Sequence, residues 1–140
     1  MFLKINQAQH ELRFGFKFMK VLDELTAATE KTPGLTPLDN AVLRLGTGDV
    51  AITPIIAAAA LAHNPTVPSM DDIEAAIEDM AAGLKTGTVC SVFIDALKTA
   101  PLHSESVTKM AEVAARMAEM QQQMMKKSMN ELESASSPAE

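Results

Sequence analysis

The sequence predicts a mainly α-helical protein, with an N-terminal β-hairpin packed on a small helical bundle and a long Met-rich helix toward the C-terminus. Three observations support this fold class. Near the N-terminus, apolar and polar side chains alternate with the period of a β-strand. Between residues 15 and 101, apolar side chains recur at helical spacing, and Pro or Gly separates the segments. The last forty residues hold six of the ten methionines, also at helical spacing.

The length of 140 residues predicts one folded domain with an appendage. We expect a folded body over residues 1–101, made of the hairpin and about four to five helices. A C-terminal amphipathic helix is expected over residues 102–130. Residues 131–140 have the composition of a disordered tail.

The predicted hairpin covers the first fourteen residues. Leu3 and Ile5 alternate with polar neighbours in the first strand, and Leu12 and Phe14 do so in the second. Residues 7–9 connect the strands and lack the Gly that marks a tight turn. Because an isolated hairpin is only marginally stable in water, we expect it to pack on the helix that follows.

Five helices are expected between Gly15 and Pro101. The apolar face of the first consists of Phe14, Phe18, Val21, Leu22 and Leu25. A break at residues 32–34 follows it. The next three helices begin with residues that cap a helix or fit its first turn, namely Thr36–Pro37, Thr53–Pro54 and Ser69–Met70.

Two of these helices have distinctive apolar patterns. Residues 55–62 are apolar on every side, which is typical of a central helix. The last helix of the body has one apolar face, made of Val89, Val92, Phe93, Ala96 and Leu97.

The final predicted helix has a stripe of large, flexible side chains. Met110, Val113, Met117, Met120 and Met124 follow one another at steps of three and four residues, which places all five on one side. Such a stripe is most often the buried side of a bundle helix or a self-association seam. The alternative is a partner-binding face, because methionine repacks around partners of different shape.

Composition argues against two classes of partner. The formal charge of −6, with no Trp or Tyr and only five Phe, does not favour nucleic-acid binding. The longest apolar stretch, residues 54–62, is too short for the ~20 residues of a membrane-spanning helix.

No secretory signal is evident, and the single Cys90 fits a reducing compartment. We therefore expect a soluble cytoplasmic protein.

The sequence shows no arrangement typical of catalysis. His10, His63 and His103 are scattered, and none has a partner at metal-ligand spacing. Residues 46–49 lack the preceding strand and the following Lys of a phosphate-binding loop. We expect a protein that is not an enzyme and that has no catalytic residues, metal or cofactor.

Several segments of the chain, taken in sequence order, resemble one protein family. Residues 5–6 and 10–23 resemble the opening of tail assembly chaperones from long-tailed (siphovirus-type) bacteriophages, in which a hairpin runs into a helix. Residues 55–63 and 68–74 are similar to the middle of that family, and residues 97–101 to its closing segment.

The resemblance covers roughly residues 2–101. The chain lacks the family's usual Gly after Asn6, and its Met-rich last helix has no counterpart there. Lys126–Lys127 permits an adenine run of the kind at which ribosomes shift frame, and many members of the family exist in two lengths.

The resemblance implies a non-enzymatic assembly factor of the host cytoplasm, absent from the mature virion. Such proteins keep the tape measure protein soluble and help tail tube subunits assemble around it. On this interpretation Met110, Val113, Met117, Met120 and Met124 contact the tape measure protein or a neighbouring copy. Two alternatives remain open, which are a structural tail or connector subunit retained in the virion and a helical adaptor of the host.

Overall fold

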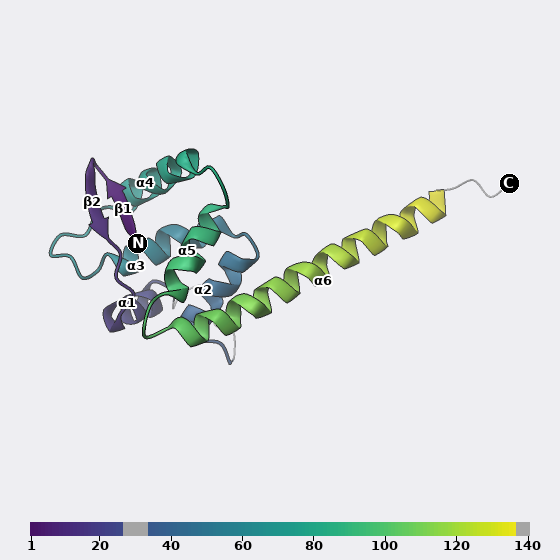
Figure 1. Ribbon diagram of the computed structural model, residues 1–140, viewed down its shortest axis with the longest axis horizontal. Helices are drawn as coiled ribbons and strands as arrows, with labels where there is room; N and C mark the ends of the chain where they lie inside the picture. The colour runs from purple at the N-terminus through teal and green to yellow at the C-terminus, as the bar shows by residue number, and fades with distance from the viewer. Residues whose placement is uncertain (27–33, 137–140) are drawn as a thin grey trace.

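The computed structural model describes residues 1–26 and 34–136, with side chains up to residue 132. A two-stranded hairpin and a group of helices form a body, from which the last helix projects (Figure 1). This confirms the predicted fold class. The elements in chain order are β1 (Phe2–Ile5), β2 (Ala8–Glu11), α1 (Phe16–Thr26), α2 (Pro37–Gly46), the 3-10 helix η1 (Val50–Ile52), α3 (Thr53–Ala60), α4 (Met70–Gly83), α5 (Val89–Lys98) and α6 (Ser104–Ser136). The predicted break at residues 32–34 lies outside the described residues, apart from Gly34.

The hairpin is tighter than the sequence suggested. Ile5 pairs with Ala8, so the turn consists of Asn6 and Gln7 alone and not of residues 7–9. Both turn residues have positive φ, 51° and 68°, as a type I′ turn requires. This short connection keeps Leu3 on the inner face with Ile5, and both are buried.

The hairpin packs on helices on two sides. The backbone N–H of Arg13 donates to the carbonyl of Ala60, 3.0 Å away, and so ties the end of the hairpin segment to α3. At the turn, the side-chain amide of Asn6 donates to Asp72 near the start of α4, at 3.1 Å. The hairpin is therefore held to the helices by its buried face and by hydrogen bonds at both ends.

The buried face of α1 differs in part from the predicted one. Phe18 and Leu22 are buried as expected, but Leu25 is 43% exposed, and the buried line ends at Thr26. Residues 18, 22 and 26 lie four apart and therefore on one side of the helix. The Thr26 hydroxyl donates to the carbonyl of Leu22 at 2.8 Å, which allows a polar residue to be buried without an unpaired group.

The middle helices begin where the sequence predicted. Thr36 and Asp39 form a capping box at the start of α2, and the Ser69 hydroxyl accepts from the N–H of Asp72 at the start of α4. In α3, Ile56 and Ala57 are fully buried, which confirms the central position expected of this apolar segment. The small alanines of α3 let neighbouring elements approach on several sides.

α6 packs against the body at a close crossing with α2. A Cβ atom built at Gly46 would overlap the Cβ of Ala114, which is itself fully buried. Gly46 is thus the last residue of α2 and also the point where α6 crosses it. Val107, two turns earlier on the same side of α6, is buried as well.

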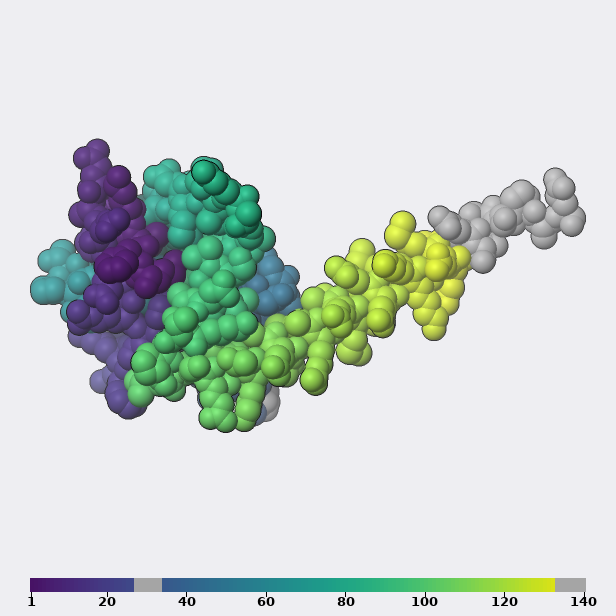
Figure 2. All heavy atoms as spheres, viewed as in Figure 1, coloured from purple at the N-terminus to yellow at the C-terminus, as the bar shows by residue number. Residues whose placement is uncertain are grey.

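Beyond this crossing α6 leaves the body and projects into solvent (Figures 1 and 2). It continues to Ser136, past the end expected at residue 130, so that part of the predicted tail is helical. Residues 137–140 of that predicted tail lie outside the described part of the chain. Among the described residues, no helix is both long enough and apolar enough to cross a membrane.

The hairpin turn generates a first prediction. Replacing Gln7 with Gly should raise the free energy of unfolding by about 1 kcal/mol, since a left-handed conformation costs a non-glycine residue roughly that much. Urea denaturation measures the change. The matched control is Gln9→Gly, an exposed residue paired with Lys4 inside the hairpin, which should destabilise the protein. An unchanged or lowered stability of Gln7→Gly would contradict the assigned turn strain.

The crossing of α2 and α6 generates a second prediction. Gly46→Ala should destabilise the protein by about 1–3 kcal/mol, because the new methyl group forces the two helices apart. The control is Gly83→Ala at the end of α4, where a Cβ has open space around it and only helix propensity changes. Equal thermal stabilities for the two variants would show that the close crossing is wrong.

A buried histidine generates a third prediction. His103 lies just before α6, is 3% exposed, and its Nε2 has no hydrogen-bond partner. Burial lowers the pKa of His103 below its ordinary value of 6.5, against a smaller opposing effect of the backbone of Phe14 and Gly15. The unfolded chain therefore binds a proton more readily than the folded one.

The contribution of His103 to the free energy of unfolding is fully present above about pH 6.5. It falls as the pH decreases toward the lowered pKa of the folded state. Urea denaturation at about pH 7.5 and about pH 5.5 should show a smaller loss for His103→Leu than for the unmodified protein. If both lose the same stability, His103 does not contribute to the acid sensitivity.

Candidate functional site

The predicted methionine stripe lies on one side of α6, but its members have different surroundings. Met110 is half-buried and packs against the core. The others are exposed, and the exposure rises along the helix from 40% at Val113 to 68% at Met124. Met117 and Met120 lie between these limits. The structure thus places the five residues on one side of the helix, and the first of them, Met110, also packs against the body.

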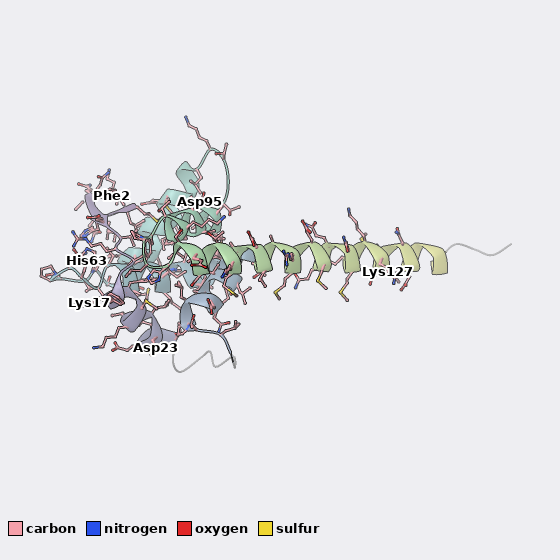
Figure 3. The ribbon with its side chains drawn as sticks, turned by 60° about the horizontal axis from the view of Figure 1, so that its bottom comes forward. Phe2, Lys17, Asp23, His63, Asp95 and Lys127 are labelled. Carbon is pink, nitrogen blue, oxygen red and sulfur yellow. The ribbon has the colours of Figure 1, made fainter. Side chains whose placement is uncertain are left out.

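A different side of α6 faces the body. Val107 and Ala114 are fully buried there, and Ala111 and Ala118 are partly buried. Successive residues turn by about 100° around a helix, so the stripe lies roughly a quarter turn or more from this line. The small alanines allow close packing on α2, and the large methionines remain on the free side. Figure 3 shows methionine sulfur atoms along one side of the projecting helix, with Lys127 in its distal part.

Three further exposed apolar residues lie near the end of α6 and were missing from the predicted stripe. Met125, Met129 and Leu132 are each more than 60% exposed. They follow one another at spacings of four and three residues. They lie on the same side of α6 as the body-facing residues, of which Ala118 is the last, and glutamines lie between Ala118 and Met125. The helical spacing of these three residues was visible in the sequence. Only the packing of α6 against the body shows that they lie on its body-facing side.

The charges on α6 nearly cancel, with five acids and four bases among its 33 residues. Glu105 Oε1 lies 3.2 Å from Lys109 Nζ on the exposed surface. Glu112 and Arg116 stand at the same spacing but make no ion pair in the described structure. Exposed pairs of this kind contribute only a few tenths of a kcal/mol. None of the five residues of the stripe is charged.

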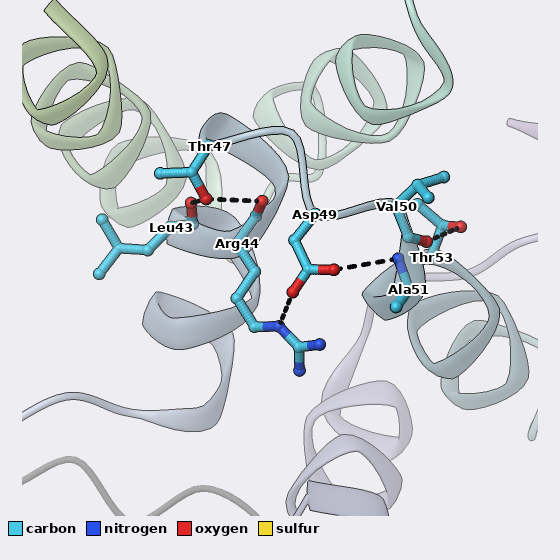
Figure 4. Close-up of polar contacts among 7 residues, drawn as sticks. All are labelled: Leu43, Arg44, Thr47, Asp49, Val50, Ala51 and Thr53. Carbon is cyan, nitrogen blue, oxygen red and sulfur yellow. Dashed lines mark hydrogen bonds and ion pairs between the residues drawn. The ribbon is translucent and has the colours of Figure 1, made fainter. Parts of the chain in front are cut away.

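A polar cluster joins α2 to η1 (Figure 4). Arg44 Nε donates to Asp49 Oδ2 at 2.7 Å, and the other carboxylate oxygen of Asp49 accepts from the N–H of Ala51 at 3.2 Å. The hydrogen bond from Arg44 is the main cause that lowers the pKa of Asp49. The polar atoms of Asp49 are engaged in fixing the loop, so this segment serves structure.

A groove of ≈ 730 Å³ lies between β1 and α4. It is lined by exposed apolar side chains such as Phe2 and by the charged residues Lys4, Asp72 and Asp79. Asp72 is already bonded to Asn6.

The histidines and the cysteine are not gathered into one site. His63 places its ring Nδ1 2.9 Å from the carbonyl of Ala60 at the end of α3, and burial raises the pKa of the Cys90 thiol. In the part of the chain that the structure describes, no group of three or more His, Cys, Asp or Glu side chains could hold a metal ion. The exposed side of α6 is the feature that most directly offers a partner surface.

Comparison with known proteins identifies the family. No curated protein and no solved structure matches the chain. A family model described as phage tail assembly chaperone protein (TAC) matches residues 2–112, which include the hairpin, the helices of the body and the start of α6. The match ends just before the exposed part of the methionine stripe. A chaperone acts by binding other proteins, and its partners are components of the assembling tail. The chain belongs to the phage tail assembly chaperone family.

Proposed function

We propose that this protein binds the tape measure protein through the stripe Met110, Val113, Met117, Met120 and Met124, keeps it soluble, and helps tail tube subunits assemble around it. The observation that carries the proposal is the row of exposed methionines on a helix that projects beyond the body. From Val113 onward the residues of the stripe are exposed, so this side of the helix is available to another chain.

The physical reason lies in the nature of the client. A tape measure protein is expected to be a long, largely helical chain with apolar faces that are exposed before assembly. Covering such a chain requires tolerant contacts at many positions. Methionine supplies them, because its unbranched, polarizable side chain adapts to different neighbours. A helix of the client can lie along the stripe in the helix-in-groove manner.

The proposal places the protein in the host cytoplasm during assembly and outside the finished particle. The body and the stripe then have separate tasks. Residues 2–112 carry the features common to the family, and the exposed part of α6 adds the client contact of this particular chain.

The test is the double variant Met117→Glu with Met120→Glu. Both side chains are exposed, so the body should keep its far-ultraviolet circular dichroism and its thermal stability. Co-purification with co-expressed tape measure protein should fall at least tenfold, because two charges would have to be buried in an apolar contact. The measurement is the amount of tape measure protein recovered with the tagged chaperone.

The matched control adds the same charge on the polar side of α6, with Gln123→Glu and Asn130→Glu, and should retain the client. Undiminished recovery with the Met117 and Met120 variant would contradict the proposed binding face. Detection of the chain in purified virions would instead favour a structural tail subunit.

A further inference from the structure

Strand β1 has an unpaired edge on the side of the hairpin that faces α4 (Figure 1). The N–H of Leu12 donates to the carbonyl of Met1 at 2.9 Å, so this pair is hydrogen-bonded. In an antiparallel hairpin such pairs alternate with pairs whose backbone groups point away from the partner strand. The N–H and C=O groups of Phe2 and Lys4 therefore point away from β2, and they have no backbone partner among the described residues.

The groove of ≈ 730 Å³ between β1 and α4 follows this edge. Phe2 and Lys4 line one wall, and Ala75 and Ala76 of α4 line the other. The hydrogen bond between the hairpin turn and the start of α4 joins the two walls at one end. The alanines leave room beside the strand, and the volume of the groove is within the range of ligand-binding sites.

An unpaired strand edge is a template for another strand. We propose that this groove binds an extended, basic segment of a partner protein, which adds to β1 as a third strand. Residues of the segment opposite Phe2 and Lys4 exchange about four hydrogen bonds with the free backbone groups of β1. The segment thereby satisfies the backbone groups that the hairpin leaves unpaired.

Charge determines which segment fits. The helix α4 has five acids and no Lys or Arg, and two of the acids, Asp72 and Asp79, line the groove. Neither of them forms an ion pair in the described structure. Lys4 is the one base among the residues that line the groove, so acids outnumber bases there. A basic segment is therefore attracted to this wall, and an acidic one is repelled.

The pleat of the added strand determines its side-chain pattern. Successive side chains of a strand point to opposite faces. The α4 wall offers apolar Ala76 and Met80 as well as the carboxylate of Asp79. A segment in which apolar and basic residues alternate can place the apolar side chains against the first two and a basic side chain beside the carboxylate.

This site lies in the body, within the residues that the family model matches, and does not involve the methionine stripe of α6. Its test uses the purified full chain and a synthetic peptide alone. The outcome therefore does not depend on whether the stripe binds the tape measure protein.

The first test uses a capped peptide of about eight residues in which valine and lysine alternate. Isothermal titration calorimetry should show saturable binding to the unmodified chain. The same peptide with glutamate in place of lysine should not bind. A peptide with N-methyl groups on two adjacent central residues should not bind either, because adjacent N–H groups point to opposite edges of a strand.

Absence of binding at about 1 mM Val–Lys peptide would overturn the proposal. So would binding of the methylated peptide, which would show charge attraction without strand addition, or equal binding of the glutamate peptide.

The second test changes the edge itself. Lys4→Pro removes an N–H that points away from β2, so the pairing of the two strands is kept. Affinity for the Val–Lys peptide should fall about tenfold or more, although the loss of a positive charge by itself would favour a basic peptide. The matched control is Glu11→Pro, which makes the same change on the outer edge of β2, outside the groove. It should keep the affinity, and an equal loss in both variants would overturn the proposal.

Hydrogen exchange of the unmodified chain provides a test without any substitution. When the peptide saturates the protein, exchange of the Lys4 amide should slow about tenfold or more, whereas exchange of the Glu11 amide should not change. Nuclear magnetic resonance measures both rates. Unchanged exchange at Lys4 with bound peptide would place the peptide elsewhere and overturn the proposal.

Discussion

The close crossing of α2 and α6 is the contact on which the functional surface depends. Gly46 has no side chain where the Cβ of Ala114 lies against α2, so the two helices approach closely. This approach decides which side of α6 is buried. Because the small residues of α6 face the body, the large methionines are left on the outside. A bulkier residue at either position would change the direction in which α6 leaves the body.

The hairpin and α3 form the second part of the framework. α3 is buried on most sides, and the hairpin segment bonds to its last residue through Arg13. His103 lies near Phe18, with the ring centres 6.1 Å apart, at the point where the chain turns into α6. The start of α6 is therefore anchored in the core, while its distal part is a free extension. This combination of a fixed base and an exposed arm suits a protein that presents an apolar surface to others.

Exposed apolar surface of this extent requires an explanation. Monomeric soluble proteins seldom leave large apolar patches open, because such patches associate. In the proposed function, a client protein covers the stripe on this arm. The family match ends at residue 112, and the exposed part of α6 lies beyond it.

Local signals in the sequence determined the secondary structure. Thr36, Ser69 and the prolines beside the helix starts act through contacts within one turn, so their effect can be predicted without knowledge of the fold. The five residues of the stripe were likewise placed on one side of α6 by spacing alone. The hairpin turn was misplaced because Gln7 adopts a left-handed conformation that its residue type does not favour.

Only the tertiary structure decided which sides of the helices are buried. Leu25 is exposed and Thr26 is buried because the neighbours of α1 lie on the side of Phe18 and Leu22. In the same way, the burial of Ala114 distinguishes the body-facing side of α6 from its free side. Helical spacing shows which residues share a side, whereas the partner that covers that side comes from segments distant in sequence. For this reason the sequence could identify the methionine stripe, but the crossing at Gly46 was needed to show that it faces solvent.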